Sequence, residues 1–292
     1  VKAIKKIPEV PLKELETLWM QVGGTLCNLE CTHCFISCSP KNDTIAMMTL
    51  VQVEERLRES RELKVKDYYI TGGEVFINPE IFEILAAILS YGPLDALTNG
   101  TQITSEKAKR LRTIQDASKN PLRFRVSMEH FDEDKNDVIR GKNAYRKAIA
   151  GIVCLAEAGF SPILTVTRTW EEESDSEMES KFVEFLRKSG VMQPQIKILP
   201  SFLLGQLAEN ERDYSQDEYV TEKCFEDFDI TQLQCATSRM ATGEGVYVCP
   251  ILVDNPAARM GDTLADTLRP FPLSHSACYT CRVTGMTCKS SS

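Results

Sequence analysis

The cysteines are the residues of this chain whose number and spacing indicate a chemical role. Eleven cysteines occur in 292 residues: four lie between positions 27 and 38, six lie between positions 224 and 288, and Cys154 stands alone. The count is odd, the chain is long, and residues 1–11 hold too short an apolar run for a signal peptide. We therefore expect metal binding rather than a disulfide framework, with one site near each end of the chain.

The N-terminal group contains a C-x3-C-x2-C triplet formed by Cys27, Cys31 and Cys34. A closed zinc site usually needs four ligands, so this triplet fits zinc poorly. Three thiolates can instead hold three irons of a [4Fe–4S] cube and leave the fourth iron open. An open iron is a place where a substrate or cofactor could chelate. Cys38, four residues further on, is interpreted as a plain loop thiol.

Between the two cysteine groups, strand-like and helix-like runs alternate. Strands are expected at residues 18–22, 68–70, 94–98, 123–128, 161–167 and 195–199, and helices at 49–64, from Asn78 onward, and at 105–117, 143–158 and 178–188. Thr49 and Gln52 form a capping box, and Asn78 before a proline is a candidate helix cap. Six β-α units predict an α/β fold with a parallel sheet. The sheet should be an open, partial (β/α)6 TIM barrel, because eight closed units need about 250 residues.

Polar motifs follow four of these strands, at the edge where the carboxyl ends of parallel strands meet. They are Gly72-Gly73-Glu74 after the second strand, Asn99 after the third, Ser127 and Glu129 at the end of the fourth, and Arg168 after the fifth. Together with the cysteine triplet, these motifs make residues 17–200 resemble the radical S-adenosylmethionine (SAM) superfamily.

The resemblance implies that the triplet holds a SAM-binding [4Fe–4S] cluster. The Gly-Gly-Glu motif would then receive the methionyl amino group of SAM, and Ser127 and Glu129 the ribose hydroxyls. Arg168 could pair with the SAM carboxylate, and Asn99 lies in a polar loop common at that position. His33 occupies the place where the family usually has an aromatic residue against the adenine.

The C-terminal cysteines are arranged around a predicted β-hairpin with glycines at its turn. Cys235 and Cys249 flank the hairpin, and a C-x2-C pair, Cys278 and Cys281, follows a Gly-Asp-Thr-Leu sequence and a short helix. A zinc ribbon has similar spacing. The order of these features resembles the SPASM and twitch auxiliary-cluster domains of radical SAM enzymes. It implies at least one auxiliary [4Fe–4S] cluster on these four cysteines.

The match to a full SPASM domain is incomplete, since the spacing after the C-x2-C pair differs and later cysteines are missing. Cys224 and Cys288 are therefore spare, or they ligate an incomplete second cluster. The expected organisation is an N-terminal extension (1–16), a radical SAM partial barrel (17–205), an acidic bridge (206–233) and an auxiliary-cluster domain (234–292).

The resemblance implies an enzyme that reductively cleaves SAM to a 5′-deoxyadenosyl radical, which abstracts hydrogen from its substrate. An auxiliary cluster suits a net oxidation, and we expect a small-molecule substrate. The alternatives are a maturase that modifies a ribosomal precursor peptide and a non-catalytic iron–sulfur or zinc protein. No catalytic base is assigned, although His130, Glu244 and Tyr247 are candidates.

Charge and hydropathy limit the partners. Thirty-four basic and forty-two acidic residues give a net charge of −8, and the isoelectric point is near 5.2. Nucleic acids and anionic membranes are therefore poor partners, and no apolar run approaches the roughly 18 residues that span a bilayer. We expect a cytoplasmic protein that receives electrons from a flavodoxin- or ferredoxin-type donor.

Overall fold

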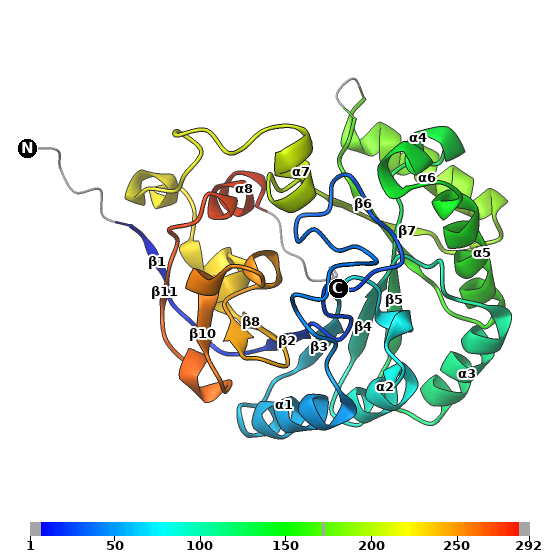
Figure 1. The fold of residues 1–292 in the computed structure, drawn as a ribbon, viewed down its shortest axis with the longest axis horizontal. Helices are drawn as coiled ribbons and strands as arrows, with labels where there is room; N and C mark the ends of the chain where they lie inside the picture. The colour runs from blue at the N-terminus through cyan, green and yellow to red at the C-terminus, as the bar shows by residue number, and fades with distance from the viewer. Residues whose placement is uncertain (1–6, 171–172, 286–292) are drawn as a thin grey trace, which may run out of the picture.

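A parallel sheet forms the centre of the computed structural model, which describes residues 7–170 and 173–285. Its parallel strands are β2 (Thr17–Met20), β3 (Asp67–Ile70), β4 (Leu94–Thr98), β5 (Leu122–Ser127), β6 (Ile163–Thr167) and β7 (Gln195–Leu199). They pair in chain order, each with the next, as the β-α alternation predicts (Figure 1). The partial (β/α)6 barrel is therefore confirmed.

Helices follow the strands and cover the outside of the sheet (Figure 1). They are α1 (Leu50–Glu62), α2 (Ile81–Leu89), α3 (Ser105–Asp116), α4 (Glu133–Arg140), α5 (Ala144–Glu157) and α6 (Asp175–Lys188). Alternate residues of a strand point to opposite faces. On β2, Leu18 and Met20 pack in the large core beneath the helices, whereas Trp19 packs in a smaller cluster with Cys27 and Cys38. The inner face of the sheet thus leads directly to the cysteine triplet.

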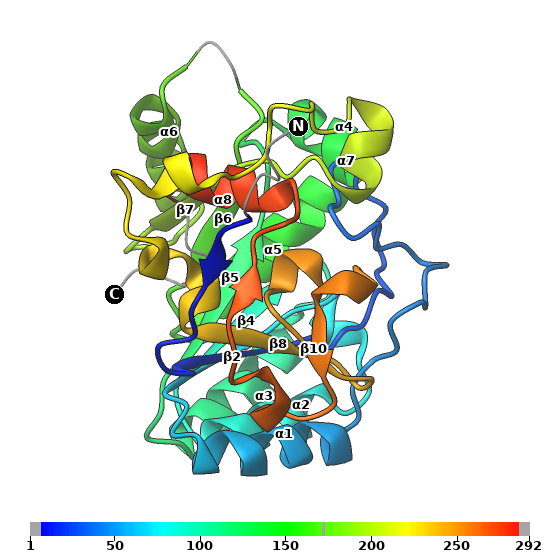
Figure 2. The same cartoon turned by 90° about the vertical axis from the view of Figure 1, so that its left-hand side faces the viewer.

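The C-terminal region extends the same sheet. Its strands are β8 (Ser238–Ala241), β9 (Val246–Tyr247) and β10 (Arg259–Gly261), and α8 (Ala277–Thr284) follows them. β8 pairs in parallel with β2, which lies beside it in Figure 2. β8 and β9 form the predicted antiparallel hairpin. Near the N-terminus, β1 (Glu9–Val10) pairs with β11 (Phe271–Pro272). The barrel and the cysteine-rich region therefore share one continuous nine-stranded sheet.

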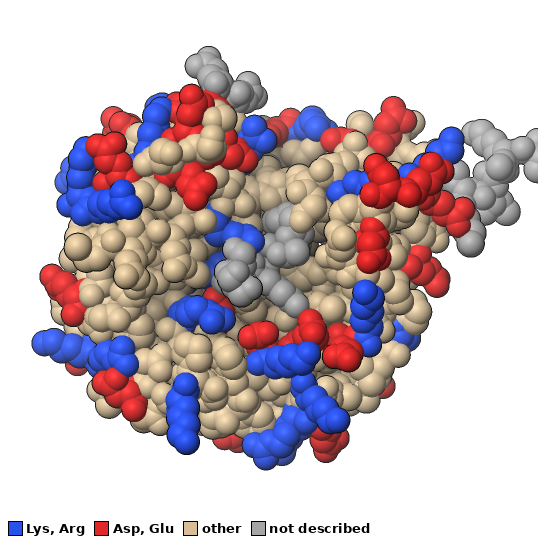
Figure 3. Space-filling model, turned by 180° about the vertical axis from the view of Figure 1, so that it is seen from behind, with Lys and Arg blue, Asp and Glu red and all other residues tan. Residues whose placement is uncertain are grey.

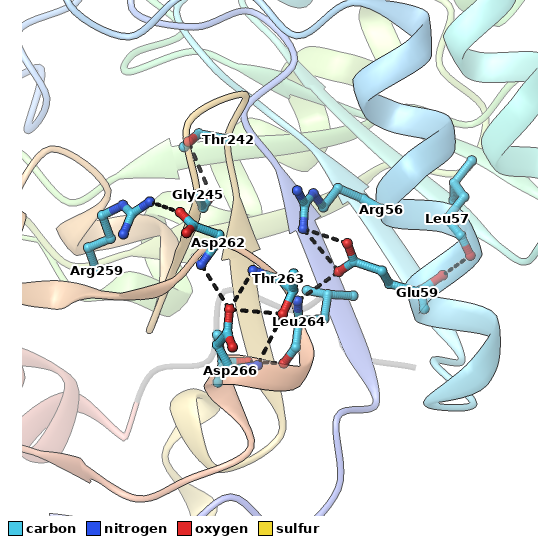
Figure 4. A network of polar contacts seen from close by, with 12 residues as sticks. Arg56, Leu57, Glu59, Thr242, Gly245, Arg259, Asp262, Thr263, Leu264 and Asp266 are labelled. Carbon is cyan, nitrogen blue, oxygen red and sulfur yellow. Dashed lines mark hydrogen bonds and ion pairs between the residues drawn. The ribbon is translucent and has the colours of Figure 1, made fainter.

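A turn after β10 fastens the C-terminal region to α1. Asp266 accepts hydrogen bonds from the backbone N–H groups of Asp262 and Thr263 and so shapes the turn. The N–H of Leu264 then donates to a carboxylate oxygen of Glu59 at 2.7 Å, and Arg56 holds the same carboxylate (Figure 4). The Gly-Asp-Thr-Leu sequence thus has a clear structural role as a docking turn.

Two details of the helices differ from the sequence expectations. The capping box of Thr49 and Gln52 is present, but Asn78 does not cap α2, which begins at Ile81. The buried Asn78 side chain donates through its NH2 group to the carbonyls of Val22 and Met48, and its oxygen accepts from the Glu80 N–H at 2.9 Å, one residue before the helix begins. Helix α4 was not expected. Among the described residues, no helix is long and apolar enough to cross a membrane.

Candidate active site

A cavity of about 210 Å³ lies at the carboxyl ends of the parallel strands. All three cysteines of the triplet line it, together with His33, Gly72, Gly73, Asn99 and Ser127 from the predicted site. Other lining residues come from the inner face of the sheet and from the loop after β7. On the molecular face shown in Figure 3, acidic and basic side chains are interspersed around the periphery, and a few Lys or Arg side chains reach toward the centre.

The environment of the three triplet sulfurs suits them to bind metal. Burial raises the pKa of Cys27 to about 12 and that of Cys31 to about 11. A hydrogen bond with Cys38 lowers the pKa of Cys34 to about 6, against the effect of burial. Backbone N–H groups donate to two of the sulfurs, from Leu29 to Cys27 at 3.4 Å and from Cys38 to Cys34 at 3.2 Å. Three partly or fully buried thiols, two of them accepting from backbone N–H groups, fit a [4Fe–4S] cluster held by three cysteines.

The surrounding backbone leaves no room for a side chain at either glycine of the Gly-Gly-Glu motif. Gly72 has a φ of +144°, and a Cβ there would lie 2.5 Å from the Cα of Gly23. A Cβ on Gly73 would lie 2.1 Å from the carbonyl oxygen of Leu26 and 2.9 Å from the Cβ of Cys27. The motif therefore packs tightly against the loop that carries the triplet, and both glycines also line the cavity.

Glu74 is fully buried and ties together the loops after β3 and β4. Its carboxylate accepts hydrogen bonds from the Thr98 hydroxyl and the Asn99 N–H, each at 2.7 Å. Burial raises the pKa of Glu74, and these donors counteract the rise. Asn99 donates in turn to the oxygen of Asn28 at 3.0 Å and lies 3.7 Å from the Cys27 sulfur. Glu74 thus positions Asn99 beside the triplet, and it is not among the residues that line the cavity.

Ser127 and Glu129 have different environments. Ser127 lines the cavity, whereas Glu129 is fully buried behind it. One Glu129 oxygen accepts from His33 Nε2 at 2.9 Å and from Arg140 at 2.5 Å, and the other accepts from the Thr167 N–H at 2.8 Å. Burial would raise the pKa of Glu129, but His33 and Arg140 hold it near 2. Glu129 therefore anchors three residues of the cavity lining, and its expected role toward ribose stays a prediction.

Arg168 lies at the rim and outside the cavity lining. Its side chain is about half exposed and pairs with Asp175 at the start of α6 at 3.2 Å. Its assignment to the SAM carboxylate stays a prediction.

Several residues of the cavity lining were not named by the sequence reasoning. Arg125 and Trp19 project from strand interiors, where a sequence pattern does not distinguish a barrel-facing side chain from a core one. Arg140 lies on the unexpected helix α4. Cys38, interpreted as a plain loop thiol, lines the cavity and is hydrogen-bonded to Cys34. The four-residue spacing between Cys34 and Cys38 was the sequence feature that could have indicated a place for Cys38 in the site.

A second, largely apolar cavity is lined by Cys235, Cys249, Cys278 and Cys281. These are the four cysteines that the sequence assigns to an auxiliary cluster. Burial raises the pKa of Cys249 to about 11 and of Cys278 to about 12, and it raises that of Cys235 further. Neutral buried thiols become thiolates when a metal binds, so this donor set fits a fully ligated cluster.

The two remaining C-terminal cysteines have other positions. Cys224 lies outside both cavities, where the Thr221 N–H donates to its sulfur at 3.4 Å. Cys288 lies outside the described residues. Within residues 7–170 and 173–285, no three His, Cys, Asp or Glu side chains are grouped closely enough to hold a single metal ion.

The two cavities share a wall. Pro250 and Ile251, which directly follow Cys249 in the chain, line both the cavity of the triplet and the cavity of the four C-terminal cysteines. The cavity of the proposed auxiliary ligands therefore adjoins the triplet cavity at this segment.

Comparison with known proteins assigns the chain to a family. Residues 22–182 match the model of the radical SAM superfamily. This match covers more than half of the chain, so the protein belongs to the radical SAM superfamily. It is accordingly an enzyme that binds a [4Fe–4S] cluster and SAM, and its SPASM-type relatives carry auxiliary clusters.

Curated relatives are similar over part of their length. The mycofactocin maturase MftC of Mycobacterium tuberculosis (strain CDC 1551 / Oshkosh) is 31% identical over 138 residues, which are 47% of this chain and 34% of MftC. GTP 3′,8-cyclase of Marinobacter nauticus is 25% identical over 189 residues, 64% of this chain and 54% of the cyclase. The matched segment thus spans about a third of MftC and about half of the cyclase.

Solved structures share the fold. Streptococcus suis SuiB bound to S-adenosylmethionine superposes with a TM-score of 0.65 and 16% identity, covering 90% of this chain and 67% of SuiB. The histidine-tagged anSMEcpe with bound AdoMet gives a TM-score of 0.61 at 14% identity, covering 95% of this chain and 84% of that protein. The shared fold thus includes the C-terminal region as well as the barrel.

Proposed function

We propose that this enzyme oxidises a peptide substrate in the triplet cavity and that an auxiliary [4Fe–4S] cluster on Cys235, Cys249, Cys278 and Cys281 accepts an electron from the reaction. When bound, the triplet's cluster and SAM supply a 5′-deoxyadenosyl radical that abstracts a hydrogen atom from the substrate. The chain's own residues hold both cofactors, exclude water from the buried cavity and set the distance between the two sites.

The wall formed by Pro250 and Ile251 is the observation that carries this proposal. Both residues line both cavities, so a substrate in the first cavity would lie beside the segment that also lines the second. Four cysteines would saturate a [4Fe–4S] cluster and leave no iron to chelate the substrate. An auxiliary cluster so placed and so ligated is suited to moving an electron.

A peptide substrate is favoured by the relatives. The mycofactocin maturase MftC and the subtilosin biosynthesis protein AlbA are similar in sequence, and SuiB, with the same fold, is known in complex with its precursor peptide SuiA. The small molecule expected from the sequence is the second candidate. It is supported by the similarity to GTP 3′,8-cyclase, whose name specifies a nucleotide substrate.

The test is an anaerobic incubation of the cluster-loaded enzyme with SAM, a reductant and each candidate peptide in turn, beginning with any short peptide encoded beside its gene. A peptide mass loss of two hydrogens, with one 5′-deoxyadenosine formed per turnover, is expected. Variants that lack Cys278 and Cys281 should still cleave SAM but should not form the oxidised peptide, whereas Cys224→Ala should form it. An unchanged peptide, together with oxidation of a nucleotide or other metabolite, would favour the second candidate.

A further inference from the structure

One wall of the triplet cavity contains none of the predicted SAM motifs. The Gly-Gly-Glu, Asn99 and Ser127 motifs follow β3, β4 and β5, which are neighbours within the sheet. This other wall comes from residues 199–202, at the end of β7, and residues 250–251, which follow β9. β7 is one edge of the sheet and β9 lies next to the other edge. Because Phe202 and Ile251 belong to one hydrophobic cluster, the two segments meet across the open side of the partial barrel.

The side chains of this wall are apolar. The two segments read Leu-Pro-Ser-Phe and Pro-Ile and contain no charged residue. The one hydroxyl, on Ser201, donates to the carbonyl oxygen of Arg168 at 3.1 Å. Phe35 also lines the cavity, and its ring lies 6.2 Å from that of Phe202, measured between centroids. We call Phe35 and residues 199–202 and 250–251 the apolar wall.

The protein leaves part of the apolar wall uncovered. Phe202 and Ile251 are 6% and 7% exposed, whereas Phe35, Leu199 and Pro200 are only half-buried. All five residues line the cavity. Apolar surface is stabilised when another apolar group covers it and removes it from water. The wall therefore favours an apolar occupant.

The charged groups of SAM do not match the apolar wall. SAM carries an ammonium, a carboxylate, a sulfonium and two ribose hydroxyls, and burying such groups is costly unless they are paired. Polar partners lie elsewhere in the lining, among them Asn99 and Ser127. The other reactant must share the cavity with SAM, because hydrogen transfer requires close approach. The apolar wall is thus available to the substrate.

We propose that the apolar wall binds an uncharged, apolar side chain of the peptide residue that the enzyme oxidises. This inference rests on the proposed function, since it takes the substrate to be a peptide in the triplet cavity, and it names the class of residue that the cavity selects. Pro250 and Ile251 belong to the wall and also line the cavity of the four C-terminal cysteines. A side chain seated on the wall would therefore lie beside the proposed electron acceptor.

The test compares the binding of matched peptides to enzyme that carries clusters and SAM but is not reduced, so that no turnover occurs. The probes are acetyl-glycyl-X-glycinamide peptides, with X either leucine or asparagine, whose side chains have equal numbers of heavy atoms. A second pair has phenylalanine or 4-pyridylalanine at X. Equilibrium dialysis with labelled acetyl groups gives each dissociation constant. We expect at least one apolar probe to bind about tenfold or more tightly than its polar match.

Variants at the end of β7 show whether this preference comes from the apolar wall. Leu199→Asn should reduce the preference to about threefold or less, whereas Leu199→Met should retain it. Leu204→Asn is the matched control, because Leu204 is also half-buried and follows β7 but lines neither cysteine cavity. This control should keep the full preference. The comparison of probes on the wild-type enzyme does not depend on any variant.

Equal binding of apolar and polar probes, or no binding of any apolar probe, would overturn the proposal. Displacement of the apolar probe by SAM would also overturn it, by assigning the apolar wall to SAM. An equal loss of preference in Leu199→Asn and Leu204→Asn would place the binding site elsewhere. The proposed function fails separately. If reduced enzyme oxidises no candidate peptide, that function is contradicted, while the preference of the unreduced enzyme is still measured.

Discussion

His33 Nε2 lies 2.9 Å from Oε1 of Glu129, a residue 96 positions further along the chain. The same oxygen accepts a hydrogen bond from Arg140, which lies on α4. His33 sits within the cysteine triplet, so this contact joins the triplet loop to the end of β5 and to the helix that follows it. The loop that carries three predicted cluster ligands is thereby fixed to the rigid sheet.

Glu129→Gln should destabilise the protein by about 3 kcal/mol, because it leaves the buried Arg140 without its counter-charge. The folded pKa near 2 lies below the ordinary value of 4.5, so Glu129 stabilises the fold fully above pH 4.5 and loses this effect as the pH falls toward 2. Anaerobic denaturant unfolding at pH 7.5 measures the full loss. The matched control is Glu133→Gln, which breaks the exposed pair with Arg146 and should cost less than about 1 kcal/mol.

The sequence predicts the order of strands and the two sets of cysteines because both depend on local patterns. β4 and β7 have the expected bounds, and the four C-terminal cysteines converge on one cavity. Tertiary packing decides what the sequence could not show. Asn78 has the sequence context of a helix cap, but its oxygen accepts from the Glu80 N–H before α2 begins, and its NH2 group joins the loops of Val22 and Met48.

The same limit applies to the candidate site. Ser127 and Glu129 belong to one motif, but only Ser127 reaches the cavity, because the chain leaves β5 after Ser127 and no longer follows the alternation of the strand. Arg125 was overlooked because the sequence does not show which face of β5 lines the cavity. Sequence spacing identifies which residues end a strand, and the curvature of the sheet determines which of them share a cavity.

Replacing Cys27, Cys31 and Cys34 together by alanine should abolish SAM cleavage and leave iron at the auxiliary site. Among the described residues, the triplet and Cys38 are the cysteines that line the first cavity, whereas four other thiols line the second. Anaerobic assay of 5′-deoxyadenosine and iron analysis of the same sample check both parts. Undiminished 5′-deoxyadenosine would refute the assignment of the triplet.

Reconstituted protein should contain about eight irons, at four for each cluster. The Cys278→Ala and Cys281→Ala double variant should lose about four of them, since the pair provides half of the thiols around the second cavity. Cys224→Ala is the control, and it should keep all eight because Cys224 lies outside both cavities. About four irons in the wild type would show that the C-terminal cysteines hold no cluster, and about twelve would require a second auxiliary cluster.

Gly73→Ala should impair loading of the triplet cluster. The added methyl group would lie 2.1 Å from the Leu26 carbonyl oxygen and 2.9 Å from the Cβ of Cys27, so the first ligand must move. Overpacking of this kind costs about 1–3 kcal/mol. Gly243→Ala is a suitable control, because there the methyl group meets only the far end of the flexible Gln52 side chain. Equal iron content and equal SAM cleavage in the two variants would contradict the prediction.

Glu59→Gln tests whether the docking turn fixes the position of the C-terminal cysteine site relative to the triplet. The Glu59 carboxylate accepts the Leu264 N–H at 2.7 Å and is held by Arg56, so the neutral amide weakens a charge-assisted contact worth about 1.5–3 kcal/mol. The turn precedes the C-x2-C pair, and the wall of Pro250 and Ile251 belongs to the same region. We therefore expect unchanged SAM cleavage without substrate but a lower yield of oxidised product for each SAM consumed.

Glu62→Gln, at the exposed end of α1, should leave this yield unchanged. If Glu59→Gln lowers SAM cleavage and product yield in equal proportion, the turn stabilises the fold as a whole and does not align the two sites.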